Sequence, residues 1–184
     1  MMRTIGGTAP TSPTLADWRA ELTTRGGVRV DVRPAAHEDE AALAEFFTHV
    51  TNEDLRFRFL TSMPRPAKAL VAALVDVDHS QTENLLAFET TSGVLVATAM
   101  IAADSRFKSA EVAIAIHSDY KQKGLGWALL DHAAAYAKAR GIKMIHSIES
   151  RDNRQAIAVE RDLGFEASLY EGDATLVRLS KRLD

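Results

Sequence analysis

Residues 111–126 read Glu-Val-Ala-Ile-Ala-Ile-His-Ser-Asp-Tyr-Lys-Gln-Lys-Gly-Leu-Gly, and this stretch decides the fold. The apolar run Ala110 to Ile116 predicts a strand, and apolar spacing over Gly124 to Arg140 predicts a helix. A strand therefore enters a helix through a loop that contains glycine. Amides exposed at a helix start carry about half a positive charge, and glycine lets a diphosphate approach the backbone. Because Lys121 and Lys123 add mobile positive charge, the loop predicts an anion-binding site.

Other phosphate-binding and catalytic motifs do not occur in the sequence. The loop lacks the Gly-Lys-Ser/Thr of a Walker motif and the Gly-x-Gly-x-x-Gly of dinucleotide-binding proteins, which disfavours ATP and NAD. There is no Gly-x-Ser-x-Gly and no His-Glu-x-x-His, so hydrolase and zincin chemistry are excluded. Many helices start after glycine, and an ordinary turn is the alternative interpretation of the loop.

Composition favours one cytoplasmic domain. The 184 residues are 46% hydrophobic, which suits a single core with a short appendage. The net charge is -3 with scattered basic residues, which argues against a nucleic-acid partner. Cysteine is absent, which excludes disulfides and thiolate metal sites. The longest apolar run, Val94 to Ala103, is too short to span a bilayer, and the amino terminus lacks a secretory signal, so no membrane association is expected.

Two parts are expected along the chain. Residues 1–27 are an N-terminal extension in which residues 1–14 are expected to be mobile and Leu15 to Thr23 to form a short docking helix. Residues 28–184 form the domain, whose class is α/β (α+β). Periodicity and turn residues predict strands at 28–33, 85–90, 94–103, 110–116, 144–149, 165–170 and 174–179. They predict helices at 37–50, 53–60, 67–75, 124–140 and 153–163.

Two sequence blocks resemble the GNAT superfamily of N-acetyltransferases. The segment Lys121-Gln122-Lys123-Gly124-Leu125-Gly126 is similar to the GNAT pyrophosphate loop, Arg/Gln-x-x-Gly-x-Gly/Ala, with lysine in place of the first residue. Asn153 with Ala156, followed by Leu163-Gly164-Phe165, resembles the helix and strand that line the pantetheine end. The resemblance covers residues 28–180 and matches the predicted order of elements.

The resemblance implies a GNAT fold, with a central, mostly antiparallel mixed sheet of about six to seven strands flanked by helices. It implies acetyl-CoA as co-substrate, no metal, and direct attack of an amine on the thioester. The coenzyme-binding residues that it implies are Ile114, Ala115, Ile116, Lys121, Gln122, Lys123, Gly124, Leu125, Gly126, Asn153 and Ala156.

Glu111 is the candidate catalytic base. It opens the apolar strand and alternates with Val112, so it faces the open side of the sheet if Val112 packs under the helix. An exposed glutamate or a salt bridge is the alternative interpretation. Many GNAT enzymes carry a tyrosine as thiolate acid where this chain has Glu160, and we therefore assign no catalytic acid.

Three further blocks resemble the Pat-type bacterial protein lysine acetyltransferases, in which a strand glutamate is the base. They are Thr51 to Leu60, Asp76 to His79 and Ala110 to Ala113. This resemblance favours a protein lysine as acceptor; the alternatives are a small-molecule amine or a non-catalytic acyl-CoA-binding regulatory module. Residues 36–55 hold six acids and no lysine or arginine, which favours a basic acceptor or, alternatively, a solvated helix face. GNAT domains frequently dimerise, so the resemblance also implies a homodimer.

Overall fold

Eight strands form one sheet in the order β1-β2-β3-β4-β5-β6-β8-β7. The structure is a computed structural model, and it describes residues 18–61, 63 and 65–184. All neighbouring strands are antiparallel except β5 and β6, which are parallel. The strands are β1 Ala20–Thr23, β2 Arg29–Pro34, β3 Thr82–Glu89, β4 Leu95–Ala103, β5 Ser109–Ile116, β6 Met144–Ser150, β7 Glu166–Leu169 and β8 Leu176–Arg182. The predicted α/β class with a mostly antiparallel mixed sheet is confirmed.

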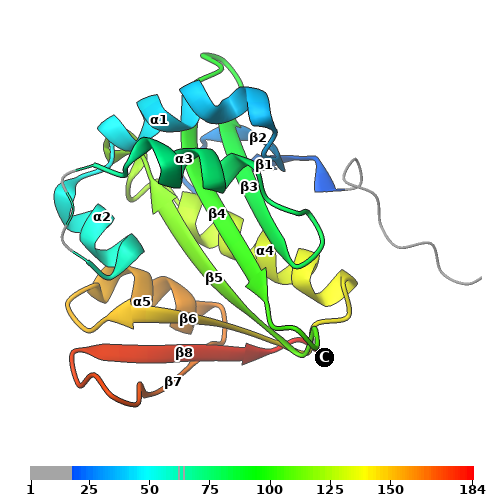
Figure 1. The fold of residues 1–184 in the computed structure, drawn as a ribbon, viewed down its shortest axis with the longest axis vertical. Helices are drawn as coiled ribbons and strands as arrows, with labels where there is room; N and C mark the ends of the chain where they lie inside the picture. The colour runs from blue at the N-terminus through cyan, green and yellow to red at the C-terminus, as the bar shows by residue number, and fades with distance from the viewer. Residues whose placement is uncertain (1–17, 62, 64) are drawn as a thin grey trace, which may run out of the picture.

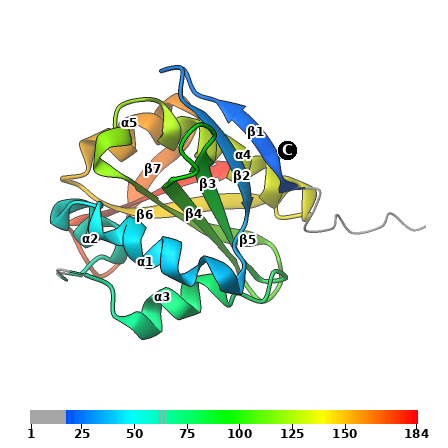
Figure 2. The same cartoon turned by 90° about the horizontal axis from the view of Figure 1, so that it is seen from above.

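Helices cover both faces of the sheet, as Figures 1 and 2 show. The helices are α1 Glu40–Thr48, α2 Asn52–Phe59, α3 Lys68–Val75, α4 Leu125–Ala139 and α5 Arg154–Asp162, with short 3-10 turns at His37–Asp39 and Ser118–Tyr120. Two hydrophobic clusters follow from this arrangement. One lies between the sheet and α4, and the other lies between the sheet and the α1 and α3 helices.

The alternation of side chains along β5 connects these two cores. Val112 is buried in the α4 core, and Ile114 packs against the same cluster. Ala115 belongs to the opposite core, with α1 and α3. Because side chains alternate across a strand, Glu111 shares a face with Ala113 and Ala115 and points away from α4. The larger aliphatic residues therefore support α4, while the smaller ones and Glu111 face α2.

The amino-terminal part differs from the prediction. The short helix expected over Leu15 to Thr23 is wrong, because Ala20–Thr23 form the edge strand β1, which pairs with β2. Trp18 packs edge-on against Tyr136 of α4, with the ring centroids 4.9 Å apart. The apolar spacing that suggested a helix therefore reflects packing against α4. A turn over Thr24 to Val28 joins the two strands, and β1 is the strand that the sequence prediction lacked. Residues 1–14, which were expected to be mobile, lie outside the described residues.

Candidate active site

The two parallel strands pair only at their beginnings. The register joins residues 109–111 of β5 with residues 144–146 of β6 and ends there. Figure 1 shows the strands diverging from this point toward α2 and α5. The sheet therefore contains a fork, and Glu111 lies at its closed end.

A cavity of about 360 Å³ occupies the fork. Its walls come from β5, β6, the start of α4, α5 and α2, so the cavity connects the α4 face of the sheet with the α2 face. Glu111 lines it, and all the predicted coenzyme-binding residues except Lys123 line it too: Ile114, Ala115, Ile116, Lys121, Gln122, Gly124, Leu125, Gly126, Asn153 and Ala156. The structure thus brings together two blocks that lie about thirty residues apart in sequence. That these residues contact coenzyme A stays a prediction.

The glycine loop has backbone geometry that larger residues do not fit. Gly124 has a φ of 86°, in the left-handed region, and a Cβ there would lie 3.2 Å from the backbone nitrogen of Arg25. A Cβ on Gly126 would lie 3.4 Å from Cδ1 of Ile116. The helix that starts here has 15 residues and leaves its first amides without intrahelical partners. The loop therefore leaves backbone amides free at the start of α4, where the sequence predicts an anion site.

The β1–β2 turn supports this loop from behind. The Gly26 amide donates to the Lys123 carbonyl at 3.2 Å. A Cβ on Gly26 would lie only 2.7 Å from that same carbonyl oxygen, so the two segments approach as closely as glycine allows. Arg25 lines the cavity, and its guanidinium lies 4.1 Å from the centre of the Trp127 ring. Arg25 is not among the predicted site residues, because it lies in the segment interpreted as an N-terminal extension.

The two loop lysines are less free than the sequence indicated. Lys121 Nζ donates to both carboxylate oxygens of Asp54, each at 2.8 Å, and both side chains are partly exposed. Lys123 lies outside the cavity wall, with its Nζ 4.9 Å from the centre of the Tyr120 ring. The mobile positive charge expected from both residues is therefore partly neutralised by α2. Arg25 supplies a cation at the cavity in addition to Lys121.

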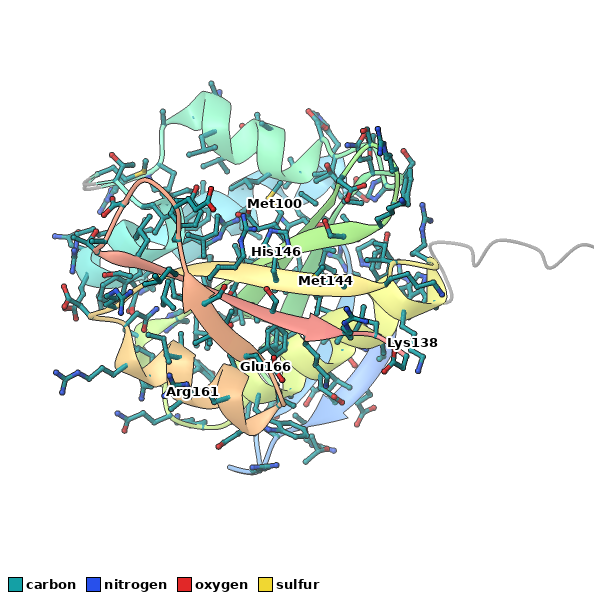
Figure 3. All side chains as sticks on the ribbon, turned by 90° about the horizontal axis from the view of Figure 1, so that it is seen from below. Met100, Lys138, Met144, His146, Arg161 and Glu166 are labelled. Carbon is teal, nitrogen blue, oxygen red and sulfur yellow. The ribbon has the colours of Figure 1, made fainter. Side chains whose placement is uncertain are left out.

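Glu111 lies where the face of β5 predicts. Its side chain is half exposed, and a carboxylate oxygen lies 4.0 Å from His146 Nε2. Burial lowers the pKa of His146. Figure 3, seen from the β6–β8 side, shows His146 and Met100 toward α3, whereas Glu166 and Arg161 lie on the α5 side. Glu111 is neither a remote surface residue nor tightly ion-paired, and its contact with a substrate stays a prediction.

A second acidic feature lines the same cavity and was not predicted. Glu149 lies near the end of β6 and Glu160 lies in α5, and both side chains line the cavity. Burial and the charge of Glu160 raise the pKa of Glu149 to about 8. Burial raises the pKa of Glu160 to about 7. The pair therefore retains at least one proton near neutral pH.

Polar groups fix the position of this pair. Ser147 Oγ donates to Glu160, and the Asn153 amide donates to Glu149 at 2.8 Å. The Asn153 side-chain oxygen also accepts from the Ala156 amide, which caps α5. Asn153, predicted from sequence as a coenzyme residue, therefore also orients an acid. The sequence signal that could have found the pair is the placement of Glu160 where the family carries tyrosine.

Arg58 of α2 faces the carboxylates across the fork. Burial lowers the pKa of its guanidinium to about 10, while the charges of Glu111 and Glu149 raise it. Its Nη2 lies 3.5 Å from the Met100 sulfur, and its buried Nε has no hydrogen-bond partner among the described residues. The sequence left open whether Arg58 pairs with nearby acids or contacts an acceptor. The structure places it on the cavity wall, with no salt bridge to a carboxylate in the part of the chain that is described.

Two negative findings apply to residues 18–61, 63 and 65–184. They contain no cluster of three or more side chains that could hold a metal ion. They also contain no helix with the length and apolar character needed to cross a bilayer.

Comparisons with known proteins agree on one family. The profile of the acetyltransferase (GNAT) family matches residues 44–165, which include the glycine loop and both strands of the fork. An acetyltransferase of Pseudomonas aeruginosa is 29% identical over 153 residues, which cover 82% of this chain and 82% of that protein.

Solved structures share the fold. The GNAT domain of S. lividans PAT aligns with a TM-score of 0.85 at 28% identity, covering 93% of this chain and 100% of that chain. A GNAT superfamily phosphinothricin acetyltransferase from Sinorhizobium meliloti, solved in complex with acetyl-CoA, aligns with a TM-score of 0.68 at 19% identity, covering 84% of this chain and 88% of that chain. The latter likeness shows the fold alone.

Proposed function

The chain belongs to the GNAT family of acetyltransferases, and on that premise we propose that it transfers acetyl from acetyl-CoA to the side-chain amine of a protein lysine. Membership in the family implies acetyl-CoA-dependent acetyl transfer. The finer statements, that the acceptor is an amine and that it belongs to a protein, are the proposal. We infer direct attack of the amine on the thioester, with both substrates held in the forked cavity.

The observation that carries this proposal is the continuity of the cavity through the sheet. The amide cradle at Gly124 lies at one end and Glu111 at the other, and both line one cavity of about 360 Å³. A donor whose diphosphate occupies the cradle would extend along β5 toward the fork, where the strand has no partner on the β6 side beyond residue 111. An acceptor would reach the same point from the α2 face.

The role proposed for Glu111 follows from the protonation state of the acceptor amine. A lysine amine with a pKa of about 10.4 is almost entirely protonated at pH 7, and producing the neutral form costs about 4.6 kcal/mol. A carboxylate near the attacking nitrogen lowers this barrier by accepting the proton. Glu111 is half exposed on the face that α2 borders, so a lysine can approach it from solvent.

A protein acceptor is favoured by similarity and by charge. The chain is similar to the S. lividans PAT domain over the full length of that domain, and two of the three Pat-like blocks, Thr51 to Leu60 and Ala110 to Ala113, contribute residues to the cavity wall. Exposed acids on and near α1 and α2 add negative charge to the surface of these helices: Glu38, Glu45 and Glu53. Such charge attracts a basic segment.

The test is release of coenzyme A from acetyl-CoA by purified protein, with lysine-bearing proteins and small amines as acceptors. We expect turnover on a protein lysine, identified by mass spectrometry, and a fall of about 10²-fold or more in the Glu111→Gln variant. Glu166→Gln serves as the matched control, because Glu166 is exposed on β7 and lies outside the cavity.

Two other outcomes would contradict the proposal in different ways. Turnover on small amines alone would make the chain a small-molecule acetyltransferase. Tight acetyl-CoA binding with no turnover on any amine would make it an acyl-CoA-binding module. Equal activity of Glu111→Gln and Glu166→Gln would remove Glu111 as the base while leaving the acceptor class intact.

A further inference from the structure

We propose that Glu149 and Glu160 form an acid–carboxylate pair that supplies the proton taken up by the sulfur of departing coenzyme A. This inference rests on the proposed acetyl transfer. It assigns the acid that the sequence lacks, since the residue standing where the family carries tyrosine is Glu160. It also explains why two glutamates face each other inside a cavity that is otherwise lined largely by apolar side chains.

The pair has the geometry of a built site. Both carboxyl groups line the cavity, and they lie close enough for the charge of Glu160 to raise the pKa of Glu149. Ser147 donates to one and Asn153 to the other, and both glutamates sit on secondary structure, at the end of β6 and inside α5. Glu160 is only 5% exposed, so solvent does not compete freely for its proton. A site held by strand and helix keeps its acid in a fixed position.

The surroundings favour one shared proton at neutral pH. Two adjacent buried carboxylates repel each other, so one proton remains between them until the pH exceeds the raised pKa values described above. Arg58 approaches from α2 and favours ionisation of Glu149, whereas Glu111 lies on β5 across the fork. The other charged residues that line the cavity are Arg25, Asp54, Lys121 and Asp162.

The proton balance of the reaction fits this arrangement. The neutral amine nitrogen, whose ammonium proton has passed through Glu111 to solvent, attacks the carbonyl carbon, a C–N bond forms, and the C–S bond breaks with its electron pair on sulfur. Glu111 accepts the nitrogen proton on the α2 face, and the pair gives its proton to sulfur on the α5 face. The pair then holds two negative charges beside Arg58 until a proton returns from Glu111 or water. A thiol has an ordinary pKa of about 8.5, which is close to that of the pair. The free energy of proton transfer from the pair to the thiolate is therefore close to zero.

A purely structural role for the pair predicts different behaviour. In that case, replacing either glutamate would lower stability and scale activity by the same factor at every pH. A proton donor predicts instead that kcat falls on the alkaline side as the pair loses its proton, and that this alkaline limb disappears when the pair is broken. The pH profile therefore separates the two roles.

The experiment compares Glu149→Gln, Glu160→Gln and Glu160→Tyr with the wild type and with Glu166→Gln. We expect both glutamine variants to lose about 10²-fold in kcat at pH 7 and to lose the alkaline limb, with acetyl-CoA affinity within about threefold of wild type. We expect Glu160→Tyr to recover part of the rate, because a phenol at this position can donate a proton. Infrared spectra should show a protonated carboxyl band near neutral pH that both glutamine variants lack.

Failure of this inference is distinguishable from failure of the proposed function. If the wild type turns over and Glu111→Gln is impaired, but both glutamine variants keep the wild-type rate and alkaline limb, only the proton-donor role is overturned. If the wild type acetylates no amine, the proposed function fails and the donor role fails with it. If the infrared band is missing in the wild type, the shared proton does not exist.

Discussion

Replacing Glu149 by glutamine should make the protein more resistant to alkaline unfolding. Burial raises the pKa of this carboxyl from its ordinary 4.5 to about 8. A raised carboxyl pKa means that the folded state holds the proton more tightly than the unfolded state, so stability falls as pH rises toward the folded-state pKa. Glutamine carries no charge at any pH and removes that penalty.

The magnitude follows from the same pKa. At pH 6 the folded protein keeps the proton that the unfolded chain has lost, and at pH 9 neither state keeps it, so the wild type loses about 3 kcal/mol between these pH values. For a protein of this size, that change corresponds to about 5–10 °C in Tm. The difference in Tm between Glu149→Gln and wild type should therefore become more positive by about that amount from pH 6 to pH 9.

The assay is thermal unfolding of both proteins at a series of pH values, followed by circular dichroism. Taking the difference between variant and wild type cancels the groups that do not interact with Glu149, so the difference reports on the Glu149–Glu160 pair. Glu166→Gln, on exposed β7, should show a difference that does not vary with pH. An equally flat difference for Glu149→Gln would refute the reasoning, because it would mean that Glu149 is ionised in the folded protein at pH 6.

Three other substitutions test the site and its support. Gly26→Ala should weaken acetyl-CoA binding about tenfold by calorimetry, because its Cβ would lie 2.7 Å from the Lys123 carbonyl and displace the loop. Asp54→Asn should tighten acetyl-CoA binding up to about fivefold at low salt, less at high salt, because it frees Lys121. Asp39→Ala should lower the free energy of unfolding by about 2 kcal/mol or more in urea titrations, because it leaves a half-buried guanidinium without the partner that it contacts at 2.6 Å.

Each of these substitutions has a matched control. Gly172→Ala strains a turn at a φ of 95° with no neighbour within 4 Å, so it should alter stability without altering acetyl-CoA affinity. Asp31→Asn removes an exposed acid of β2 outside the cavity and should change neither affinity nor stability measurably. Unchanged affinity in Gly26→Ala would show that the hairpin does not position the loop. Weaker binding in Asp54→Asn would show that Asp54 holds Lys121 in its productive place.

The sequence was sufficient where local chemistry decides the structure. The alternation along β5, the apolar periodicity of the helices and the glycines before α4 are local signals, so the elements and the loop were predicted close to their observed bounds. Glu111 was placed on the correct face by the same alternation. β1 was missed because Trp18 and Leu22 are four residues apart, as in a helix, while the strand depends on pairing with β2.

Features that depend on distant contacts could not be predicted. The ion pair of Lys121 with Asp54 joins residues 67 positions apart, and no local pattern indicates it. The pairing of Glu149 with Glu160 depends on how α5 crosses the end of β6. The raised pKa values of Glu149 and Glu160 follow from the burial of these side chains. Burial of a glutamate was not predicted from the sequence of a helix as short and polar as α5.

The narrow joint between β5 and β6 has a mechanical consequence for the whole molecule. It divides the sheet into a five-stranded half, β1 to β5, and a three-stranded half, β6 to β8, joined by a register of three residue pairs. We expect this joint to act as a hinge, because only a short ladder of main-chain hydrogen bonds opposes its opening. A ligand bound in the fork would contact both halves of the sheet, and its binding would stabilise the folded molecule by mass action. The hinge is therefore where we expect the protein to flex when empty and to become rigid when loaded.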